Sequence, residues 1–223
     1  MMNQDANKVS WMSRQWKECR GLILFLILMT LFRSALADWN VVPTGSMKPT
    51  IVEGDRILVN KIAYDLRLPF SHISVFKKAD PKRGDIIVFD SSVSEVRLVK
   101  RVIGIPGDSI TMRDNVLTIN GTTLNYNTLR TLPIVEDKSE DLFGVKHAVR
   151  IRKSGSRASS FSEVVIPDKL YLVLGDNRDN SRDSRFIGLI PRHEIVGRTS
   201  SVVLSLNYDN YYLPRSKRFF KAL

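Results

Sequence analysis

A serine between conformationally restricted residues is the first candidate for chemistry in this sequence. Ser46 lies in the segment 42–50, directly after Gly45, and Pro43 and Pro49 close the segment on either side. Proline fixes its own backbone and pushes the preceding residue towards extended conformations, whereas glycine lets another chain approach the main chain closely. We therefore expect a stiff extended turn that presents one hydroxyl, which suits either a nucleophile or a plain linker.

A lysine within an apolar strand is the second candidate. Over residues 96–102 the alternation of side chains puts Lys100 on the same face as Val96, Leu98 and Val102. Burial among apolar side chains disfavours the charged form and lowers the pKa of a lysine from about 10.4 towards neutrality. A neutral lysine can act as a general base, whereas a Lys100 that reaches solvent past a sheet edge stays charged and cannot.

Histidine, thiol and metal chemistry fit the sequence less well. His72, His147 and His193 have no carboxylate at a recognisable spacing, although a Ser-His-Asp triad is recognised in space rather than in sequence. No H-E-x-x-H motif is present, and the acidic run at 176–183 does not match an EF-hand. Cys19 is the only cysteine, which excludes an intrachain disulfide and a thiolate cluster. We expect no metal and no other cofactor.

Short strands separated by turns must position these candidates. Apolar runs at 56–62, 86–89 and 94–105 each lie next to a turn that contains glycine. Asn120 and Gly121 separate two further apolar runs and are typical of a two-residue hairpin turn. Strands this short and this closely spaced predict a mostly antiparallel β domain.

A polar segment at 175–185 follows a buried-strand pattern at 171–174. It alternates aspartate, asparagine, serine and arginine, which can close a dense network of hydrogen bonds and ion pairs. Such a network makes a loop rigid enough to position other groups, but the same composition also fits a solvated turn.

The N-terminus predicts a membrane anchor. Residues 1–20 are polar and basic, and residues 21–37 are largely apolar, with Arg33 as the single charged residue. At about 1.5 Å per residue, 21–37 would give roughly 25 Å of helix against a hydrocarbon core of roughly 30 Å. The basic N-terminus predicts a cytoplasmic location for 1–20. A cleavable secretory signal with an A-x-A site at 35–37 is the alternative, and both interpretations export the remainder of the chain.

The remainder divides into two parts of a core and an insertion. Residues 125–165 are less patterned and predict an insertion or subdomain between core parts 38–124 and 166–223. The chain has 34 Lys+Arg and 23 Asp+Glu, a formal net charge of +11. No RNA-binding, zinc-finger or helix-turn-helix pattern is present, so we attribute the charge to an anionic membrane surface rather than to nucleic acid. The tail at 211–221 mixes aromatic and basic residues, which suits the same surface or a solvated tail.

Taken together, these segments resemble the bacterial type I signal peptidases, the membrane-bound Ser-Lys leader peptidases. The resemblance rests on five segments that follow one another in the order typical of that family: 43–50, 54–59, 82–89, 99–108 and 175–185. It implies a mostly β fold, in which an antiparallel catalytic core with a small variable insertion follows one N-terminal transmembrane helix. It also implies a single-pass protein of the bacterial inner membrane, with a cytoplasmic N-terminus and the catalytic domain on the outer, periplasmic side.

The resemblance also assigns roles to individual residues. Ser46 would be the acylated nucleophile and Lys100 its general base, while the Ser46 N–H and the Thr44 hydroxyl would form the oxyanion hole. Ser181 would orient the lysine through a hydrogen bond, and Asp183 and Arg185 would be the supporting ion-pair residues. Shallow pockets for small substrate residues at −1 and −3 would be lined by Val42, Met47, Ile51, Leu98 and Val99.

The function expected from the resemblance is removal of N-terminal signal peptides from exported preproteins after A-x-A sites. The expected partners are these preproteins and the lipid bilayer, with no nucleic acid. Alternatives are a peptidase dedicated to one partner such as a pilin, and a self-cleaving protease of the LexA type, which the missing DNA-binding helices disfavour. The alternative outside the enzymes is a membrane-anchored β scaffold without catalytic activity.

Overall fold

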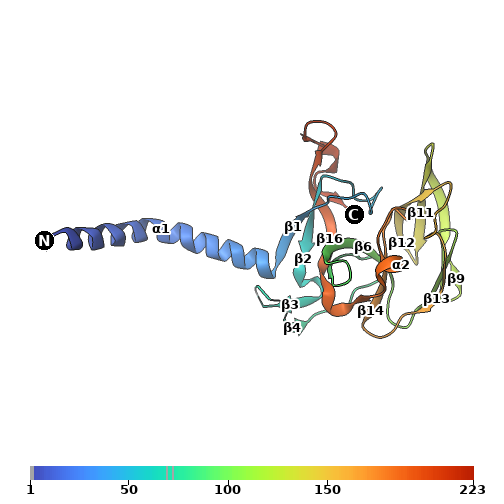
Figure 1. The fold of residues 1–223 in the computed structure, drawn as a ribbon, viewed down its shortest axis with the longest axis horizontal. Helices are drawn as coiled ribbons and strands as arrows, with labels where there is room; N and C mark the ends of the chain where they lie inside the picture. The colour runs from blue at the N-terminus through green and yellow to red at the C-terminus, as the bar shows by residue number, and fades with distance from the viewer. Residues whose placement is uncertain (1–2, 69, 72) are drawn as a thin grey trace.

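A long helix leads into a body made almost entirely of β-strands (Figure 1). The computed structural model describes residues 3–68, 70–71 and 73–223. Helix α1 (Asn3–Ala35) includes most of the apolar run expected at 21–37, and its described part projects away from the body. Among the described residues, no helical stretch combines the length and the hydropathy that crossing a membrane requires.

The main sheet carries both halves of the expected core. Its strands are, in spatial order, β1 (Ala37–Val41), β2 (Asp55–Asn60), β16 (Ile195–Asn207), β5 (Ile86–Ser91), β6 (Val96–Gly104), β14 (Leu170–Leu174) and β15 (Ile190–Pro191). Two short strands, β17 (Leu213–Pro214) and β18 (Lys221–Ala222), also pair with β16. Each neighbouring pair is antiparallel, so β1 and β6 run in the same direction.

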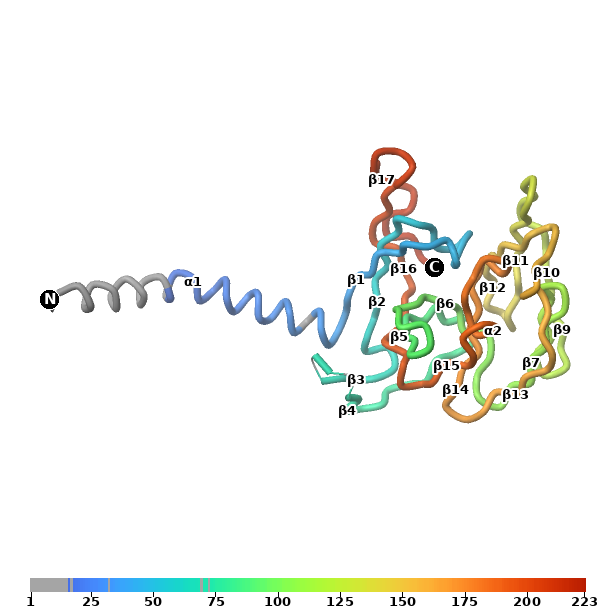
Figure 2. Tube along the Cα trace, viewed as in Figure 1, coloured from blue at the N-terminus to red at the C-terminus, as the bar shows by residue number. Residues whose placement is uncertain are grey.

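Two smaller sheets lie on the side of the main sheet away from α1 (Figure 2). One contains β13 (Phe161–Val165), β7 (Ser109–Arg113), β8 (Val116–Ile119) and β9 (Thr122–Thr123). The other contains β10 (Asn125–Thr131), β11 (Val135–Leu142) and β12 (Val145–Arg152). Because β13 pairs with β7, the first of these sheets spans the boundary that the sequence suggests at residue 125.

Several predicted elements are confirmed. The hairpin at Asn120 and Gly121 joins β8 to β9, and both residues have positive φ, 50° and 77°, as a primed turn requires. The strand expected at 94–105 is β6, and the mostly antiparallel fold is as predicted. The short helix α2 (Ser184–Ile187) was not predicted, because four residues carry no helical periodicity.

The remaining elements connect the sheets. Three single turns of 3-10 helix are η1 (Lys61–Ala63), η2 (Arg192–Glu194) and η3 (Ser216–Arg218). Strands β3 (Asp65–Arg67) and β4 (Ser74–Lys77) form a separate two-stranded hairpin close to the end of α1.

One apolar cluster supports the turn that contains Ser46. Val42, Met47 and Ile51 pack there with side chains from β2, β5 and β16. Met47 and Ile51 are at most 1% exposed. The residues on both sides of Ser46 are therefore anchored in the core, which holds the serine in one place.

Candidate active site

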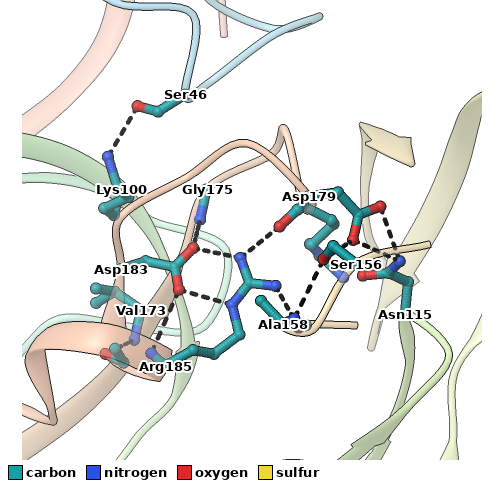
Figure 3. Close-up of polar contacts among 12 residues, drawn as sticks. Ser46, Lys100, Asn115, Ser156, Ala158, Val173, Gly175, Asp179, Asp183 and Arg185 are labelled. Atoms are coloured by element: carbon teal, nitrogen blue, oxygen red, sulfur yellow. Dashed lines mark hydrogen bonds and ion pairs between the residues drawn. The ribbon is translucent and has the colours of Figure 1, made fainter. Parts of the chain in front are cut away.

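Ser46 and Lys100 meet although they lie 54 positions apart (Figure 3). The Nζ atom of Lys100, in the middle of β6, is 2.8 Å from the Oγ atom of Ser46, in the turn after β1. The same nitrogen donates a hydrogen bond of 2.9 Å to the Val99 carbonyl. Lys100 is only 2% exposed, so its side chain does not reach solvent, and the placement predicted from strand alternation is confirmed.

Burial makes Lys100 a weaker base than an ordinary lysine. Loss of hydration lowers the pKa of its amine to about 8, because the charged form is disfavoured in an apolar environment. The carboxylates of Asp183 and Asp176 oppose this shift, and the Arg185 guanidinium adds to it. Near pH 8 about half of the molecules therefore hold Lys100 as a neutral amine that can accept the Ser46 proton.

The loop after β14 makes two hydrogen bonds to the turn that contains Ser46. The Asn177 N–H donates to the Ser46 carbonyl at 3.0 Å, and the Asn177 side-chain amide donates to the Gly45 carbonyl at 2.9 Å. A Cβ atom at Gly175 would lie 2.5 Å from the Ser46 carbonyl oxygen. Only glycine at 175 therefore lets the two segments approach so closely.

A buried ion pair fixes the same loop to β6. Arg101, the neighbour of Lys100, donates two hydrogen bonds of 2.9 and 2.8 Å to the Asp176 carboxylate. The Thr50 hydroxyl also donates to Asp176, at 2.5 Å. These bonds connect β6, the loop after β14 and the end of the turn that contains Ser46. Asp176 lies in the polar segment 175–185 that was expected to form ion pairs, whereas its pairing with Arg101 was not predicted.

Asp183 and Arg185 form a second ion pair below the dyad (Figure 3). Asp183 is fully buried, caps the N-terminus of α2 and accepts a hydrogen bond of 2.9 Å from the Gly175 N–H. Arg185 binds both carboxylate oxygens at 2.7 Å and donates to the carbonyls of Ala158 and Arg178. Asp183 therefore holds the start of the loop, and Arg185 joins the loop to the part of the chain expected to be an insertion.

Ser181 lies beside Gly175 rather than in hydrogen-bond contact with the dyad. Its hydroxyl is buried and has no hydrogen-bond partner among the described residues. A Cβ atom at Gly175 would meet the Ser181 side chain as well as the Ser46 carbonyl, so the serine lies close to the turn. The structure therefore brings Ser181 near the site without the predicted bond to Lys100.

Two donors next to the nucleophile are free. In the described part of the chain, neither the Ser46 N–H nor the Thr44 hydroxyl donates a hydrogen bond to another group. Thr44 is exposed and lines the groove beside the serine. Both predicted oxyanion donors are therefore available to a bound carbonyl.

A groove of about 430 Å³ leads from the dyad along β6. Its wall is formed by the end of β1, the serine turn and the first half of β6: Asn40, Val41, Val42, Pro43, Thr44, Ser46, Met47, Val96, Arg97, Leu98, Val99 and Lys100. Of the five predicted pocket residues, Ile51 is not in this wall; it packs with Val42 and Met47 in the core.

Two polar side chains also line the groove, and neither was predicted from the sequence. Asn40 and Arg97 line it, and the Asn40 amide nitrogen is buried without a hydrogen-bond partner among the described residues. Arg97 binds Asp90 through two hydrogen bonds of 2.7 and 2.9 Å. No pattern in the sequence indicated that Asn40 and Arg97 would line the groove.

Among the described residues, no histidine makes a hydrogen bond with Ser46 or Lys100. His147 lies 3.1 Å from a carboxylate oxygen of Glu140, which in turn accepts a hydrogen bond from Arg178. His72 lies outside the described residues. Within the described ranges, no three His, Cys, Asp or Glu side chains are arranged to hold a metal ion.

Comparisons with known proteins point to one family. A family model described as "Signal peptidase, peptidase S26" matches residues 15–204. The chain is 39% identical to Signal peptidase I of Pseudomonas fluorescens, over 82% of this chain and 69% of that protein. It is 32% identical to Signal peptidase I P of Bacillus subtilis subsp. natto, over 91% and 92%. A crystal structure of a signal peptidase I from Enterococcus faecalis is 29% identical and matches with a TM-score of 0.36, covering 54% of this chain and 97% of that one. The chain therefore belongs to the signal peptidase family, peptidase S26.

Proposed function

We propose that this chain is a serine endopeptidase that removes N-terminal signal peptides from exported preproteins. The contact of 2.8 Å between a buried lysine of lowered pKa and an otherwise unactivated serine carries the proposal. Ser46 acts as the nucleophile and Lys100 as its general base. Family membership supports the substrate class, since the relatives named above are signal peptidases.

The reaction proceeds through an acyl-enzyme. Neutral Lys100 takes the Ser46 proton, and the alkoxide adds to the scissile carbonyl, whose oxygen is held by the Ser46 N–H and the Thr44 hydroxyl. The protonated Lys100 then gives its proton to the leaving amine, so the C–N bond breaks and an ester on Ser46 remains. Lys100, neutral again, takes a proton from water, the hydroxide adds to the ester carbonyl, and the proton returns to Ser46 as the peptide acid leaves.

The groove suits an extended peptide with small side chains. Val42, Met47, Leu98 and Val99 present apolar walls near the dyad, which favours small residues at −1 and −3 and hence A-x-A sites. The pairing of β6 with β14 begins at Arg101, so the part of β6 before it has no strand partner on that side among the described residues. The groove lies between the end of β1 and this part of β6, so a peptide strand that pairs with β6 there would lead to Ser46.

Attachment to the cytoplasmic membrane completes the proposal. The described apolar side chains in the second half of α1 are largely exposed, and they include Leu22, Leu24, Phe25, Leu26, Ile27, Leu28, Met29 and Leu31. At the end of the helix Arg33 binds Asp38 at 2.7 Å and stacks over the Trp39 ring, a combination typical of a membrane interface. We place residues 1–20 in the cytoplasm, the apolar stretch of 21–37 in the bilayer and the β body on the outer, periplasmic face. N-terminal sequencing of protein from the membrane fraction tests whether residues 1–37 are retained or are removed at the A-x-A sequence that ends at Ala37.

Cleavage of an A-x-A preprotein in detergent micelles tests the enzymatic part of the proposal. We expect Ser46→Ala and Lys100→Ala each to abolish cleavage while both variants still unfold cooperatively. An Ile134→Ala change, at a side chain 77% exposed on the turn between β10 and β11, is the matched control and retains activity. Cleavage by either dyad variant at the wild-type rate would refute the assignment.

A further inference from the structure

One polar side chain in the groove beside Ser46 has no assigned role. Polar residues in the wall of this groove are Asn40, Thr44, Ser46, Arg97 and Lys100. Ser46 and Lys100 are the proposed dyad, and Thr44 is a proposed oxyanion donor. Arg97 is held by Asp90 through two hydrogen bonds of 2.7 and 2.9 Å. Of these five residues, Asn40 is therefore left without a function.

The Asn40 side chain carries a buried polar atom that is not paired. Its amide nitrogen has no hydrogen-bond partner in the described part of the chain. Buried polar groups in proteins are nearly always paired, because a group that has lost its water without gaining a partner is destabilising. An unpaired amide in the wall of a substrate groove therefore indicates a partner that arrives with the substrate.

The alternation of side chains along β1 relates Asn40 to the cleavage point. Trp39 and Val41 are exposed, whereas Asn40 and Val42 are not, so the last two share the inner face of the strand. Val42 belongs to the same apolar cluster as Met47, the residue after Ser46. We therefore place Val42 beside the substrate residue at −1, the last residue before the scissile bond.

An extended substrate has the same spacing as the strands that border the groove. Its side chains at −1 and −3 point the same way and lie about 6.6 Å apart, whereas the side chain at −2 points away. The same two-residue step leads from Val42 to Asn40 on β1 and from Lys100 to Leu98 on β6, and all four residues line the groove. The residue at −3 therefore lies in the part of the groove that Asn40 and Leu98 line.

We propose that Asn40 is a specificity-determining residue that selects a hydroxyl-bearing side chain, serine or threonine, at position −3 of the signal peptide. A hydroxyl both donates and accepts hydrogen bonds, as a primary amide does, so the two groups can pair whichever end of the amide faces the groove. A valine at −3 has the shape of threonine but leaves the amide unpaired and excludes water from it. The proposal rests on the function proposed above and narrows the preferred sites to S-x-A and T-x-A.

Two precursors that differ only at −3 test the preference in the full chain. One carries threonine and the other valine at −3, and both carry alanine at −1. We expect the wild type to cleave the threonine precursor with a kcat/KM about two- to tenfold higher, the range that one neutral hydrogen bond gives. Asn40→Leu keeps the size of the side chain but removes its hydrogen-bonding groups, and it is expected to bring this ratio to one or below.

Two controls separate the −3 contact from general effects. Asn127→Leu makes the same chemical change at an exposed position of β10 and is expected to keep the wild-type ratio. The exchange of threonine for valine at −2, whose side chain points away from Asn40, is expected to give a ratio near one in every protein. Because both precursors are compared on the same preparation, a loss of folded protein in Asn40→Leu cancels in the ratio.

Several results would overturn the proposal. Equal kcat/KM values for the two −3 precursors in the wild type would do so without any variant. So would a threonine preference that persists in Asn40→Leu, or an equal loss on both precursors, because Asn40 would then support the groove rather than select the residue at −3. Failure of the Ser46–Lys100 assignment would instead appear as activity in the dyad variants, so the two proposals fail separately.

Discussion

Lys100 reaches Ser46 from a strand whose neighbours bury its amine, and the two reacting atoms lie 2.8 Å apart. The same burial lowers the pKa of the lysine to about 8. A general base is most useful when its pKa lies near the working pH, because it is then both deprotonated and basic enough to take a proton. Geometry and burial therefore act together in one residue.

Catalysis is expected to rise with pH and to level off above an apparent pKa of about 8. Only the neutral amine accepts the Ser46 proton, so kcat/KM follows the deprotonated fraction of Lys100. Lys100→Arg is expected to be inactive at every pH, because a guanidinium does not lose its proton in this range. The measurement is kcat/KM on an A-x-A peptide between pH 6 and 10, and turnover by the arginine variant would contradict the account.

Stability should also depend on the buried lysine. Because the pKa of Lys100 is about 8 in the folded chain and 10.5 in the reference state, the unfolded chain binds more protons between these values. The free energy of unfolding of the wild type, compared with Lys100→Met, should therefore rise from pH 8 to pH 10.5, by up to about 3 kcal/mol. Urea unfolding of both proteins across this range isolates the lysine, since other titrating groups cancel in the difference. If the difference in the free energy of unfolding between the two proteins did not change with pH, Lys100 would not be buried in the folded chain.

Removing the charge of Asp183 should change both stability and the pH profile. Asp183→Asn leaves the largely buried Arg185 without its counter-ion, which costs about 3 kcal/mol in comparable buried pairs. The Asp183 carboxylate raises the pKa of Lys100, so its loss should move the activity profile to lower pH. Thermal melts and the kcat/KM profile are the two readouts.

The control for this change is Asp90→Asn, which breaks an ion pair of similar length whose side chains are about two-fifths exposed. This substitution should lower the free energy of unfolding by less than about 1 kcal/mol, because solvent already screens the pair. Asp90→Asn should also leave the pH profile in place. Equal losses of stability in both variants would contradict a supporting role for Asp183.

Thr44 offers a test of the oxyanion hole. Thr44→Val keeps the shape of the side chain but removes the hydroxyl, and loss of one such donor lowers kcat about a hundredfold. Thr44→Ser restores the donor and should recover most of the rate. The KM should change little in either variant, because the donor acts mainly on the transition state. A valine variant with wild-type kcat would exclude Thr44 from the hole.

Local patterns made Ser46 and Lys100 candidates, and the resemblance to the type I signal peptidases assigned them the roles of nucleophile and base. Proline and glycine beside Ser46 indicate a stiff turn, and strand alternation puts Lys100 on an apolar face. The pairing of Arg101 with Asp176 could not be predicted in this way, since the two residues are 75 positions apart and nothing near either one specifies the other. The pairing of β13 with β7 across a long excursion of the chain escaped prediction for the same reason.

The position of Ser181 shows a different limit. The resemblance to a family implies a bond from its hydroxyl to Lys100, whereas the structure has this hydroxyl buried beside Gly175 without a partner among the described residues. No pattern of residue types records which way a side-chain hydroxyl points. Its role as the residue that orients Lys100 stays a prediction.

Covalent labelling of Ser46 tests the central claim most directly. The wild type, Ser46→Ala and Lys100→Met are treated with a serine-directed acylating inhibitor at several pH values, and the modified peptide is identified by mass spectrometry. An adduct on Ser46 is expected in the wild type alone, formed at a rate that rises with pH around an apparent pKa of about 8. An adduct on another residue, or labelling of Ser46 in Lys100→Met at the wild-type rate, would contradict it.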